Sequence, residues 1–410
     1  MRIFNQYKGL RKEQYVIFAC KLIDNLGSMI GPMMTLILST KLGMNASEIA
    51  MYTIMVTVLS LPIVLFGGKI TDRFNKKLII NIFDISTSII YIVCGIFGLS
   101  KVTLVFYIVG SLFQVAESPA YDSLVADFST SEDRDKAYSL NYLGLNLGMM
   151  LAPTIGGLLL NNHLSLMFII NGTFQIASII VFDIFIKDTR PIIDTSNKYE
   201  AKEENRISSL QVLMKNKIVI IFMIIFSFSI TCYNMWGYLM PLSLTSVQGV
   251  NGSVFYGTMS SLNCVVVVLC TTPLTALLTK TTSINRMMLG NTLEISGFII
   301  FLLFINKPFM YYVAIIIFTI GEITNTITTG PHLTKRIPMN YRGRIMSILY
   351  FMESVVYSLC SVFIGKVYDY KGLNVAWILV IVIGITTIIA YQLTKRKDKE
   401  TYPDLYEKGI

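Results

Sequence analysis

Charged residues are scarce in this chain. Only 14% of its 410 residues are Asp, Glu, Lys or Arg, whereas 53% are hydrophobic, and the mean hydropathy is +0.61. A soluble protein of this size cannot bury so large a hydrophobic fraction, and its surface needs a larger share of charged side chains. The composition therefore excludes a soluble enzyme and predicts a membrane protein.

Sequence signals for nucleotide, metal or disulfide chemistry are also missing. The chain has two histidines and six cysteines, and all six cysteines fall within apolar stretches without metal-ligand spacing. It contains no Walker loop, no glycine-rich dinucleotide fingerprint and no HExxH pair. We therefore expect no metal, no organic cofactor and no enzyme activity. A membrane-embedded enzyme or a non-transporting sensor would need a catalytic constellation or a soluble domain, and neither is visible.

Long apolar stretches are abundant instead. A helix needs about 20 mostly apolar residues to cross a bilayer, and twelve such stretches follow one another with short connectors. We place them at residues 15–39, 48–68, 78–99, 102–127, 137–160, 165–186, 218–245, 253–279, 287–305, 309–332, 345–365 and 374–394. The expected fold class is an all-α membrane protein with twelve transmembrane helices.

One polar stretch, residues 187–217, interrupts this series and is predicted to be a cytoplasmic linker. It separates an N-terminal six-helix half, residues 1–186, from a C-terminal six-helix half, residues 218–394. The remaining residues, 395–410, are expected to form a cytoplasmic tail. The chain therefore divides into two equal sets of spans.

The two halves show signs of an internal duplication. NIFDIS, which contains Asp84, matches NTLEIS, which contains Glu294, and Pro119 lies over Pro331 at nearly the same offset. Because each half has an even number of spans, the copies are parallel repeats, an arrangement typical of rocking transporters with a site between the halves. The matched positions of Asp84 and Glu294 favour a structural role for both acids.

The net charge of +9 is compatible with nucleic-acid binding or with the excess of basic residues in cytoplasmic loops of membrane proteins. Most of the 34 Lys and Arg residues fall on one side if the N-terminus is cytoplasmic, and they are dispersed over seven separate segments. This dispersal indicates no nucleic-acid partner and predicts that both termini are cytoplasmic. The short loops and the Lys-, Ile- and Asn-rich composition fit a bacterial inner (plasma) membrane.

The connector after the second span carries a recognisable motif. It reads GGKITDRFNKK, residues 67–77, with glycines at the helix end, an Asp-Arg pair and then a basic pair. This pattern resembles the loop 2–3 signature of the major facilitator superfamily. The resemblance implies a facilitator fold with alternating access, and it implies a conformational gating role for Gly68, Asp72 and Arg73.

The fifth span carries a second motif, GLNLGMMLAPTIGG, from Gly144 to Gly157. Glycines such as Gly148 allow another helix to approach closely, and Pro153 bends the span by removing a backbone hydrogen bond. The string resembles the antiporter signature of drug-exporting facilitators, with Ala152 in place of a glycine. The resemblance implies the multidrug-efflux, drug:proton antiporter subgroup, and a gating role for Gly148, Pro153 and Gly157.

Ionisable residues inside predicted spans are the candidate functional sites, because each costs about 2.5 to 3.5 kcal/mol or more to insert. In facilitators spans 1, 4, 7 and 10 line a central cavity, so the resemblance implies that Asp24, Glu117 and Glu322 converge there. Glu353 in span 11 is a further candidate. We expect these carboxylates to couple protons or bind substrate. Glu322 is the leading candidate because no basic residue lies near it in its span, whereas Lys21 lies near Asp24.

Aromatic and amide side chains supply the remaining candidates for the substrate cavity. These are Tyr233, Asn234 and Trp236 in span 7, and Asn325 in span 10. Broad aromatic faces and flexible methionines suit flat apolar molecules, and an acidic cavity favours lipophilic cations.

Together these features predict a monomeric secondary active transporter, surrounded by membrane lipid, that exports small amphipathic or lipophilic compounds by proton antiport. The proton gradient is the expected driving force. Two alternatives stay open: a dedicated exporter of one native metabolite, such as a siderophore or a lipid precursor, and a proton-coupled uptake symporter.

Overall fold

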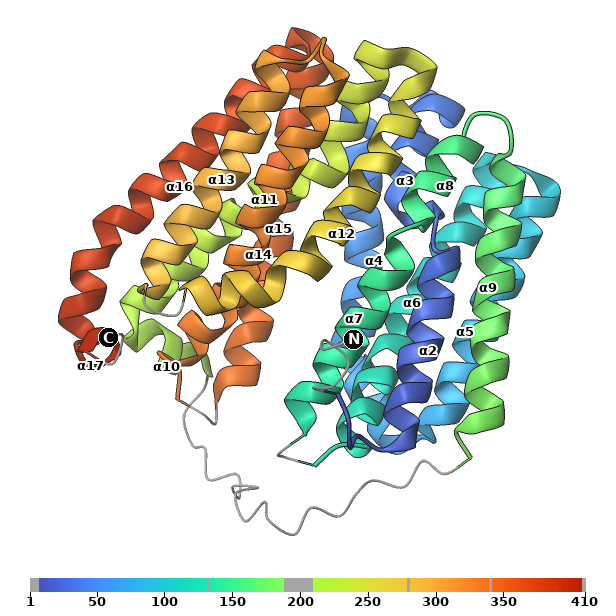
Figure 1. The fold of residues 1–410 in the computed structure, drawn as a ribbon, viewed down its shortest axis with the longest axis horizontal. Helices are drawn as coiled ribbons and strands as arrows, with labels where there is room; N and C mark the ends of the chain where they lie inside the picture. The colour runs from blue at the N-terminus through green and yellow to red at the C-terminus, as the bar shows by residue number, and fades with distance from the viewer. Residues whose placement is uncertain (1–6, 131–132, 188–208, 279–280, 339–340, 408–410) are drawn as a thin grey trace. The chain divides into compact units, whose positions relative to one another are not determined.

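Within its described ranges, the computed structural model consists of helices joined by short connectors (Figure 1). It describes residues 7–130, 133–187, 209–278, 281–338 and 341–407, except for the side chains of residues 65–73, 135, 209–210, 343 and 407. The helices are α2 (Lys12–Gly27), α3 (Ile30–Leu36), the π-helix η1 (Ile37–Lys41), α4 (Ala46–Arg73), α5 (Lys76–Phe97), α6 (Lys101–Asp127), α7 (Arg134–Met149), α8 (Ala152–Leu159), α9 (Leu164–Phe185), α10 (Ser209–Lys215), α11 (Lys217–Gln248), the 3₁₀ helix η2 (Gly249–Asn251), α12 (Gly252–Leu278), α13 (Ser283–Leu303), α14 (Pro308–Thr334), α15 (Arg342–Lys371), α16 (Leu373–Thr401) and α17 (Asp404–Glu407).

Eleven helical segments within the described ranges are long and apolar enough to cross a membrane. One of them, Lys217–Leu278, contains both α11 and α12, so the eleven segments correspond to the twelve predicted spans. Large apolar side chains such as Val58, Ile89 and Leu359 are exposed on these helices, as expected of surfaces that contact lipid. The predicted all-α, twelve-span fold class is confirmed.

Local sequence explains where several helices begin and end. The side chain of Asn75 accepts hydrogen bonds from the first backbone N–H groups of α5, and Ser100 forms a capping box with Thr103 at the start of α6. Such caps satisfy N–H groups that have no partner within the helix. Gly98 follows α5 with a φ of 73°, a backbone conformation that side chains with a Cβ rarely adopt.

Two predicted spans are interrupted by prolines. The first span breaks at Ser28 and Met29, just before Pro32, and the fifth span breaks at Met150 and Leu151, just before Pro153. Proline has no backbone N–H and its ring crowds the carbonyl of the residue four positions earlier, so a continuous helix is unfavourable there. The sequence predicted a bend at the fifth span, whereas the break in the first span was not expected.

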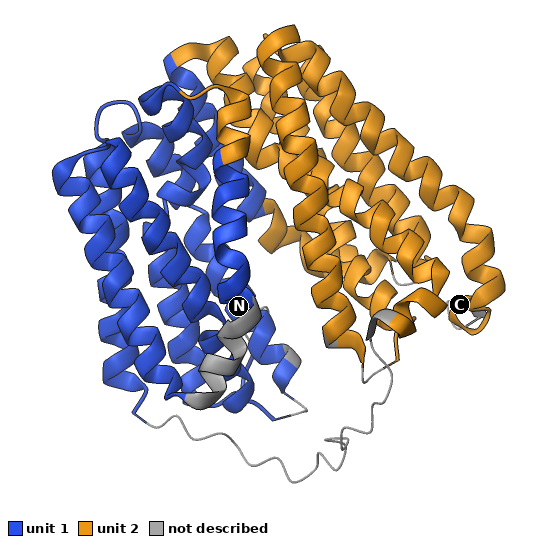
Figure 2. Ribbon diagram, turned by 180° about the vertical axis from the view of Figure 1, so that it is seen from behind, with its two compact units in different colours: residues 1–43, 52–200, 250–265 blue, residues 44–51, 201–249, 266–410 orange. Residues whose placement is uncertain are grey.

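The chain forms two compact units, which Figure 2 shows in different colours. Unit 1 comprises residues 1–43, 52–200 and 250–265, and unit 2 comprises residues 44–51, 201–249 and 266–410. Compared with the predicted halves, the start of α4 belongs to unit 2 and the first half of α12 belongs to unit 1. The predicted linker, 187–217, includes the short helix α10, and its residues 188–208 lie outside the described part of the chain.

Helix packing within each unit repeats the same pattern. In unit 1, α5 packs against α6 and α9, and α2 packs against α7 and α9. In unit 2, the corresponding α13 packs against α14 and α16, and α11 packs against α15 and α16. The same neighbours therefore occur in both units in the same chain order, which agrees with the duplication inferred from the sequence.

The residues predicted to form a cytoplasmic tail belong to unit 2 and are anchored in it at Asp398. Helix α16 continues to Thr401, and Asp398 near its end is fully buried. The guanidinium of Arg336 donates to both carboxylate oxygens of Asp398, and the Tyr406 hydroxyl donates to Oδ2 at 2.6 Å. Burial and this contact raise the pKa of Tyr406. Of the predicted tail, residues 408–410 lie outside the described part of the chain.

Candidate functional site: an acidic cavity in unit 2

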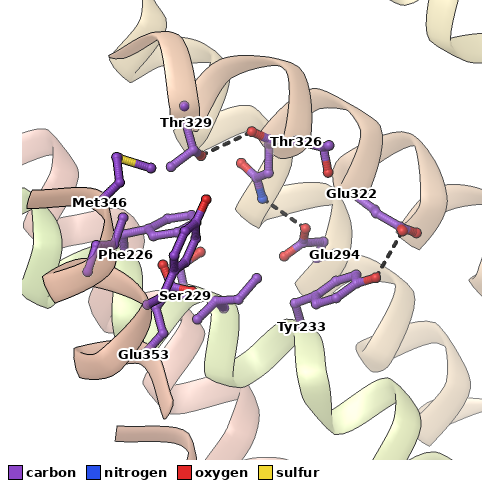
Figure 3. Close-up of a pocket in the computed structure, with 14 residues that line it drawn as sticks. Phe226, Ser229, Tyr233, Glu294, Glu322, Thr326, Thr329, Met346 and Glu353 are labelled. Atoms are coloured by element: carbon purple, nitrogen blue, oxygen red, sulfur yellow. Dashed lines mark hydrogen bonds between the residues drawn. The ribbon is translucent and has the colours of Figure 1, made fainter. Parts of the chain in front are cut away.

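Unit 2 contains a cavity of about 340 Å³ between α11, α13, α14 and α15 (Figure 3). It is large enough for a small organic molecule, because ligand pockets begin at about 300 Å³. The lining residues are Phe226, Ser229, Ile230, Tyr233, Glu294, Glu322, Asn325, Thr326, Thr329, Gly330, Met346, Leu349, Tyr350 and Glu353. The cavity therefore combines an apolar wall with three carboxylates.

Glu322 on α14 is oriented by a tyrosine on α11. The Tyr233 hydroxyl donates a hydrogen bond to Glu322 Oε1 at 2.9 Å, and Figure 3 shows the two side chains pointing toward one another. The ring of Tyr233 stacks on Phe318, one turn before Glu322, with centroids 5.7 Å apart. The hydrogen bond and the aromatic contact together hold this carboxylate at the cavity.

Glu294 on α13 belongs to a buried network of polar side chains. Asn325 Nδ2 donates to Glu294 Oε1 and to Asn291 Oδ1, both at 2.8 Å, and Ser229 Oγ donates to Asn291 Oδ1 at 2.8 Å. Glu294 is 2% exposed. Because buried polar groups are costly unless hydrogen-bonded, this network fixes the relative positions of α11, α13 and α14 beside the cavity.

Close contact between α13 and α14 depends on two glycines. A Cβ added at Gly321 would collide with the carbonyl oxygen of Gly290 and approach the backbone N of Glu294, and one added at Gly290 would collide with Asn325. Both positions are helical, so glycine is favoured there by the short distance between the helices and not by an unusual φ. The approach places Glu294 within hydrogen-bonding distance of Asn325.

Replacing Gly321 by Val is expected to lower the free energy of unfolding by about 1 to 3 kcal/mol, because the added methyl groups overpack the α13–α14 contact. Thermal unfolding of the purified protein in detergent measures this effect. Gly237→Ala on α11 is the matched control, since a Cβ there meets no atom within 4 Å and alanine favours helix. Equal melting temperatures for the two variants would contradict the packing argument.

Glu353 on α15 completes the acidic set. It lines the cavity, and its Oε1 is buried without a hydrogen-bond partner. A buried carboxylate oxygen of this kind is stabilised by a proton or by a cationic ligand. Among the described residues that line the cavity, three are acidic and none is Lys, Arg or His, so binding a cation or a proton reduces the repulsion between the carboxylates.

Two of the predicted cavity residues in span 7 do not line this cavity. Asn234 follows Tyr233 directly, and consecutive residues of an α-helix point about 100° apart, so the two side chains face different directions. Trp236 packs against Phe318 with ring centroids 5.6 Å apart. Tyr233 and the predicted Asn325 both belong to the lining.

Asp24 and Glu117 lie in unit 1, whereas Glu322 and Glu353 lie in unit 2. Asp24 Oδ1 and Glu117 Oε2 are both buried without a hydrogen-bond partner. The ammonium of Lys21 lies over the ring of Tyr121, 3.9 Å from its centroid. Unit 1 therefore has two acidic residues of its own, Asp24 and Glu117, each with a buried carboxylate oxygen. Their convergence with Glu322 stays a prediction.

The repeat-related acids Asp84 and Glu294 have different surroundings. Asp84 is 4% exposed, and its two oxygens accept hydrogen bonds from the Tyr121 hydroxyl at 3.1 Å and from Gln175 Nε2 at 3.0 Å. These bonds join α5, α6 and α9 and fit a structural role. Glu294 also belongs to a network but lines the cavity, where the sequence interpretation did not place it. Its signal in the sequence was an acid within an apolar span.

The predicted gating residues fall into two groups. Gly68, Asp72 and Arg73 are in the last turns of α4, and their side chains lie outside the described part of the chain. At Gly148 an added Cβ would lie 2.6 Å from Asn25 Cβ on α2, and at Gly157 it would collide with a carbonyl oxygen of α12 within unit 1. The fifth span thus makes close helix contacts through both glycines, while its gating role stays a prediction.

Two repeats of six apolar helices define a multi-pass membrane protein of the transporter class. The family model described as "Major Facilitator Superfamily" matches residues 22–361. The chain belongs to this superfamily of transporters.

Relatives and solved structures agree with this assignment. The chain is 23% identical to "Uncharacterized MFS-type transporter YqjV" of Bacillus subtilis (strain 168) over 303 residues, which cover 72% of each protein. It is 24% identical to "Quinolone resistance protein NorA" of Staphylococcus aureus over 169 residues, which cover 41% of this chain and 43% of NorA. The structure is similar to those of the POT family transporter PepTSo (TM-score 0.73, 15% identity, 95% and 98% coverage) and the nucleoside transporter NupG (0.69, 12%, 93% and 99%). At these identities the structures support the fold alone.

Proposed function

We propose that this protein exports small amphipathic or lipophilic compounds, preferably cations, in exchange for protons. The observation that carries the proposal is the cavity of unit 2, in which Glu294, Glu322 and Glu353 face a shared space whose described lining has no basic residue. Such a site attracts positive charge, because a carboxylate in an apolar surrounding is stabilised by a nearby cation.

The apolar part of the lining supports organic substrates over inorganic ions. Phe226, Tyr233 and Tyr350 offer aromatic rings, and Met346 and Leu349 offer flexible apolar surface. Aromatic faces attract organic cations, and methionine side chains adapt to ligands of different shape. These residues favour flat compounds with a positive charge and an apolar body.

Exchange follows from competition for the same carboxylates. A proton on Glu322 removes the negative charge that attracts a cationic substrate, so proton binding and substrate binding exclude one another. Alternating access would then carry the proton inward and the substrate outward. The antiporter-like motif of the fifth span and the similarity to a protein named for quinolone resistance support the export direction. The protein is proposed to lie in a bacterial plasma membrane with both termini in the cytoplasm.

Proteoliposomes that contain a pH-sensitive dye test the proposal. After a pH gradient is imposed, each of several unrelated lipophilic cations is expected to cause protons to cross the membrane in the direction opposite to its own movement. A response to only one compound would indicate a dedicated exporter. Movement of proton and compound in the same direction would indicate a symporter and would overturn the proposal, as would silence across the panel from protein shown to be folded.

A further inference from the structure

A second cavity in unit 2, of about 430 Å³, lies where the loop before α13, the end of α14, the start of α15 and α17 meet. Four basic side chains line it: Arg286, Lys335, Arg336 and Arg342. Asp404 is the one acidic residue in the described lining. The positive-inside pattern assigns these segments to the cytoplasmic end of the protein. The charge of this cavity is thus opposite to that of the acidic cavity.

The basic residues have different local partners. Arg336 is committed to Asp398 through two hydrogen bonds and donates a third to the carbonyl oxygen of His332. Arg286 Nε donates to Thr281 Oγ1 at 3.1 Å, and Arg342 Nε donates to the carbonyl oxygen of Ile337 at 3.3 Å. A neutral oxygen partner leaves the charge of the Arg342 guanidinium uncompensated, and the exposed Lys335 adds a second positive charge. The cavity therefore keeps a net positive charge after the ion pair of Arg336 is taken into account.

Two further polar atoms of this lining, one on His332 and one on Thr282, are buried and lack a hydrogen-bond partner. His332 is 1% exposed, and its Nδ1 contacts Ser283 Oγ at 2.7 Å, whereas its Nε2 has no hydrogen-bond partner. The hydroxyl of Thr282 is also buried without a partner. If Ser283 donates to Nδ1, the Nε2 of a neutral histidine carries a proton and is a donor. Unsatisfied buried groups of this kind indicate a ligand with several acceptor oxygens.

The same lining includes the beginning of a long helix. Thr281, Thr282 and Ser283 line the cavity, and α13 begins at Ser283 without a side-chain cap at Thr282. The first N–H groups of a helix have no partner within it and carry partial positive charge. Helix N-termini bind phosphate groups for this reason. The helix end, the unpartnered His332 Nε2 and Thr282 hydroxyl, and the basic side chains thus surround one space.

We infer that this cavity binds a phosphate group, carried either by the headgroup of an anionic phospholipid or by a soluble phosphate compound. A phosphate has the charge and the acceptor oxygens that Arg, Lys, a histidine N–H and a helix N-terminus recognise together. Basic pockets between membrane helices on the cytoplasmic side bind lipid headgroups by the same chemistry. This site is separate from the acidic cavity and does not depend on the proposed transport reaction.

Lys335→Gln tests the inference, because Lys335 is exposed and its replacement is compatible with folding. The purified full chain in detergent is titrated with inorganic phosphate, with chloride at matched ionic strength as the reference. Saturable binding of phosphate is expected in wild type, weakened about tenfold by Lys335→Gln, as for loss of a hydrogen bond to a charged group. Lys397→Gln, an exposed position on α16 outside the lining, is the matched control and is expected to bind as wild type does.

The charge of Asp404 provides a test of opposite sign. Asp404→Asn removes the acidic residue of the lining and is expected to tighten phosphate binding, because it removes repulsion between two anions. In a parallel measurement, nanodiscs of phosphatidylcholine with phosphatidylglycerol are followed by native mass spectrometry for retained lipid. Saturable binding of free phosphate assigns the site to a soluble compound, and phosphatidylglycerol retained by wild type but lost in Lys335→Gln assigns it to lipid. Absence of both, or equal binding in the Lys335→Gln and Lys397→Gln variants, would overturn the inference.

Discussion

Glu322→Gln is expected to abolish proton-driven export while the protein remains folded. Glutamine has the shape of a protonated glutamate and can still accept the hydrogen bond from Tyr233, so the variant resembles the proton-loaded state permanently. Loss of a hydrogen-bonded charge at a binding site costs about 1.5 to 3 kcal/mol, and we expect efflux in proteoliposomes to fall at least about tenfold. Glu400→Gln, which removes an exposed carboxylate on α16, is the control and should transport as wild type does.

Binding of a lipophilic cation is measured at several pH values. This measurement shows whether Glu322→Gln removes proton coupling or only disturbs the packing of the cavity. In wild type, protonation removes the charge that attracts the cation, so binding should weaken as the pH falls. In Glu322→Gln this dependence should flatten. The other titratable groups of the cavity are Tyr233 of α11, Glu294 of α13, and Tyr350 and Glu353 of α15, so Glu294→Gln and Glu353→Gln are measured alongside. Unchanged pH dependence and unchanged efflux in Glu322→Gln would assign coupling to another carboxylate.

Asp398→Asn is expected to destabilise unit 2 strongly, and by more than Gly321→Val does. The side chains of Arg336 and Asp398 are 2% and 0% exposed, so their charges are removed from water and rely on one another. Breaking a buried pair by removing one partner costs about 3 to 5 kcal/mol, because the remaining charge is left without compensation. Thermal unfolding in detergent should therefore show a large decrease in melting temperature.

An exposed pair on the same helix provides the comparison. Arg396 and Glu400 are 91% and 63% exposed and lie four residues apart, and such pairs contribute about 0.3 to 0.5 kcal/mol. Glu400→Gln should leave the melting temperature nearly unchanged. Replacing both buried partners, Arg336→Met with Asp398→Leu, should recover much of the loss, because no unpaired charge remains. A decrease no larger for Asp398→Asn than for Glu400→Gln would show that the pair contributes little.

The fold class could be predicted from the sequence because it depends on hydropathy, which each stretch of the chain shows by itself. A bilayer requires long apolar helices with every backbone group hydrogen-bonded internally, so hydropathy alone predicted the spans. The duplication was visible as well, since Asp84 and Glu294 lie in matching sequence strings. Pro153 predicted a bend in the fifth span, where the structure has a break. Pro32 causes a similar break in the first span, but prolines such as Pro62 and Pro241 remain inside continuous helices, and packing decides which outcome occurs.

The candidate sites depended on contacts between helices, which hydropathy cannot predict. Sequence reasoning found Glu322 and Glu353 because a charge inside an apolar span is conspicuous. It did not place Glu294 beside them, since the close approach at Gly290 and Gly321 brings α13 and α14 together only in the folded unit. The second cavity of unit 2, with its basic lining, and the packing of Asp398 against Arg336 were equally inaccessible, because their residues lie far apart in the chain.

The sequence by itself determined that this protein is a twelve-span, duplicated membrane protein and which acids are placed within its spans. The tertiary structure decided which of those acids share a cavity, which are held in structural networks, and where basic residues from the ends of separate helices meet. The physical reason is that burial in a bilayer acts on each helix individually, whereas a binding site is formed by side chains that only helix packing brings together.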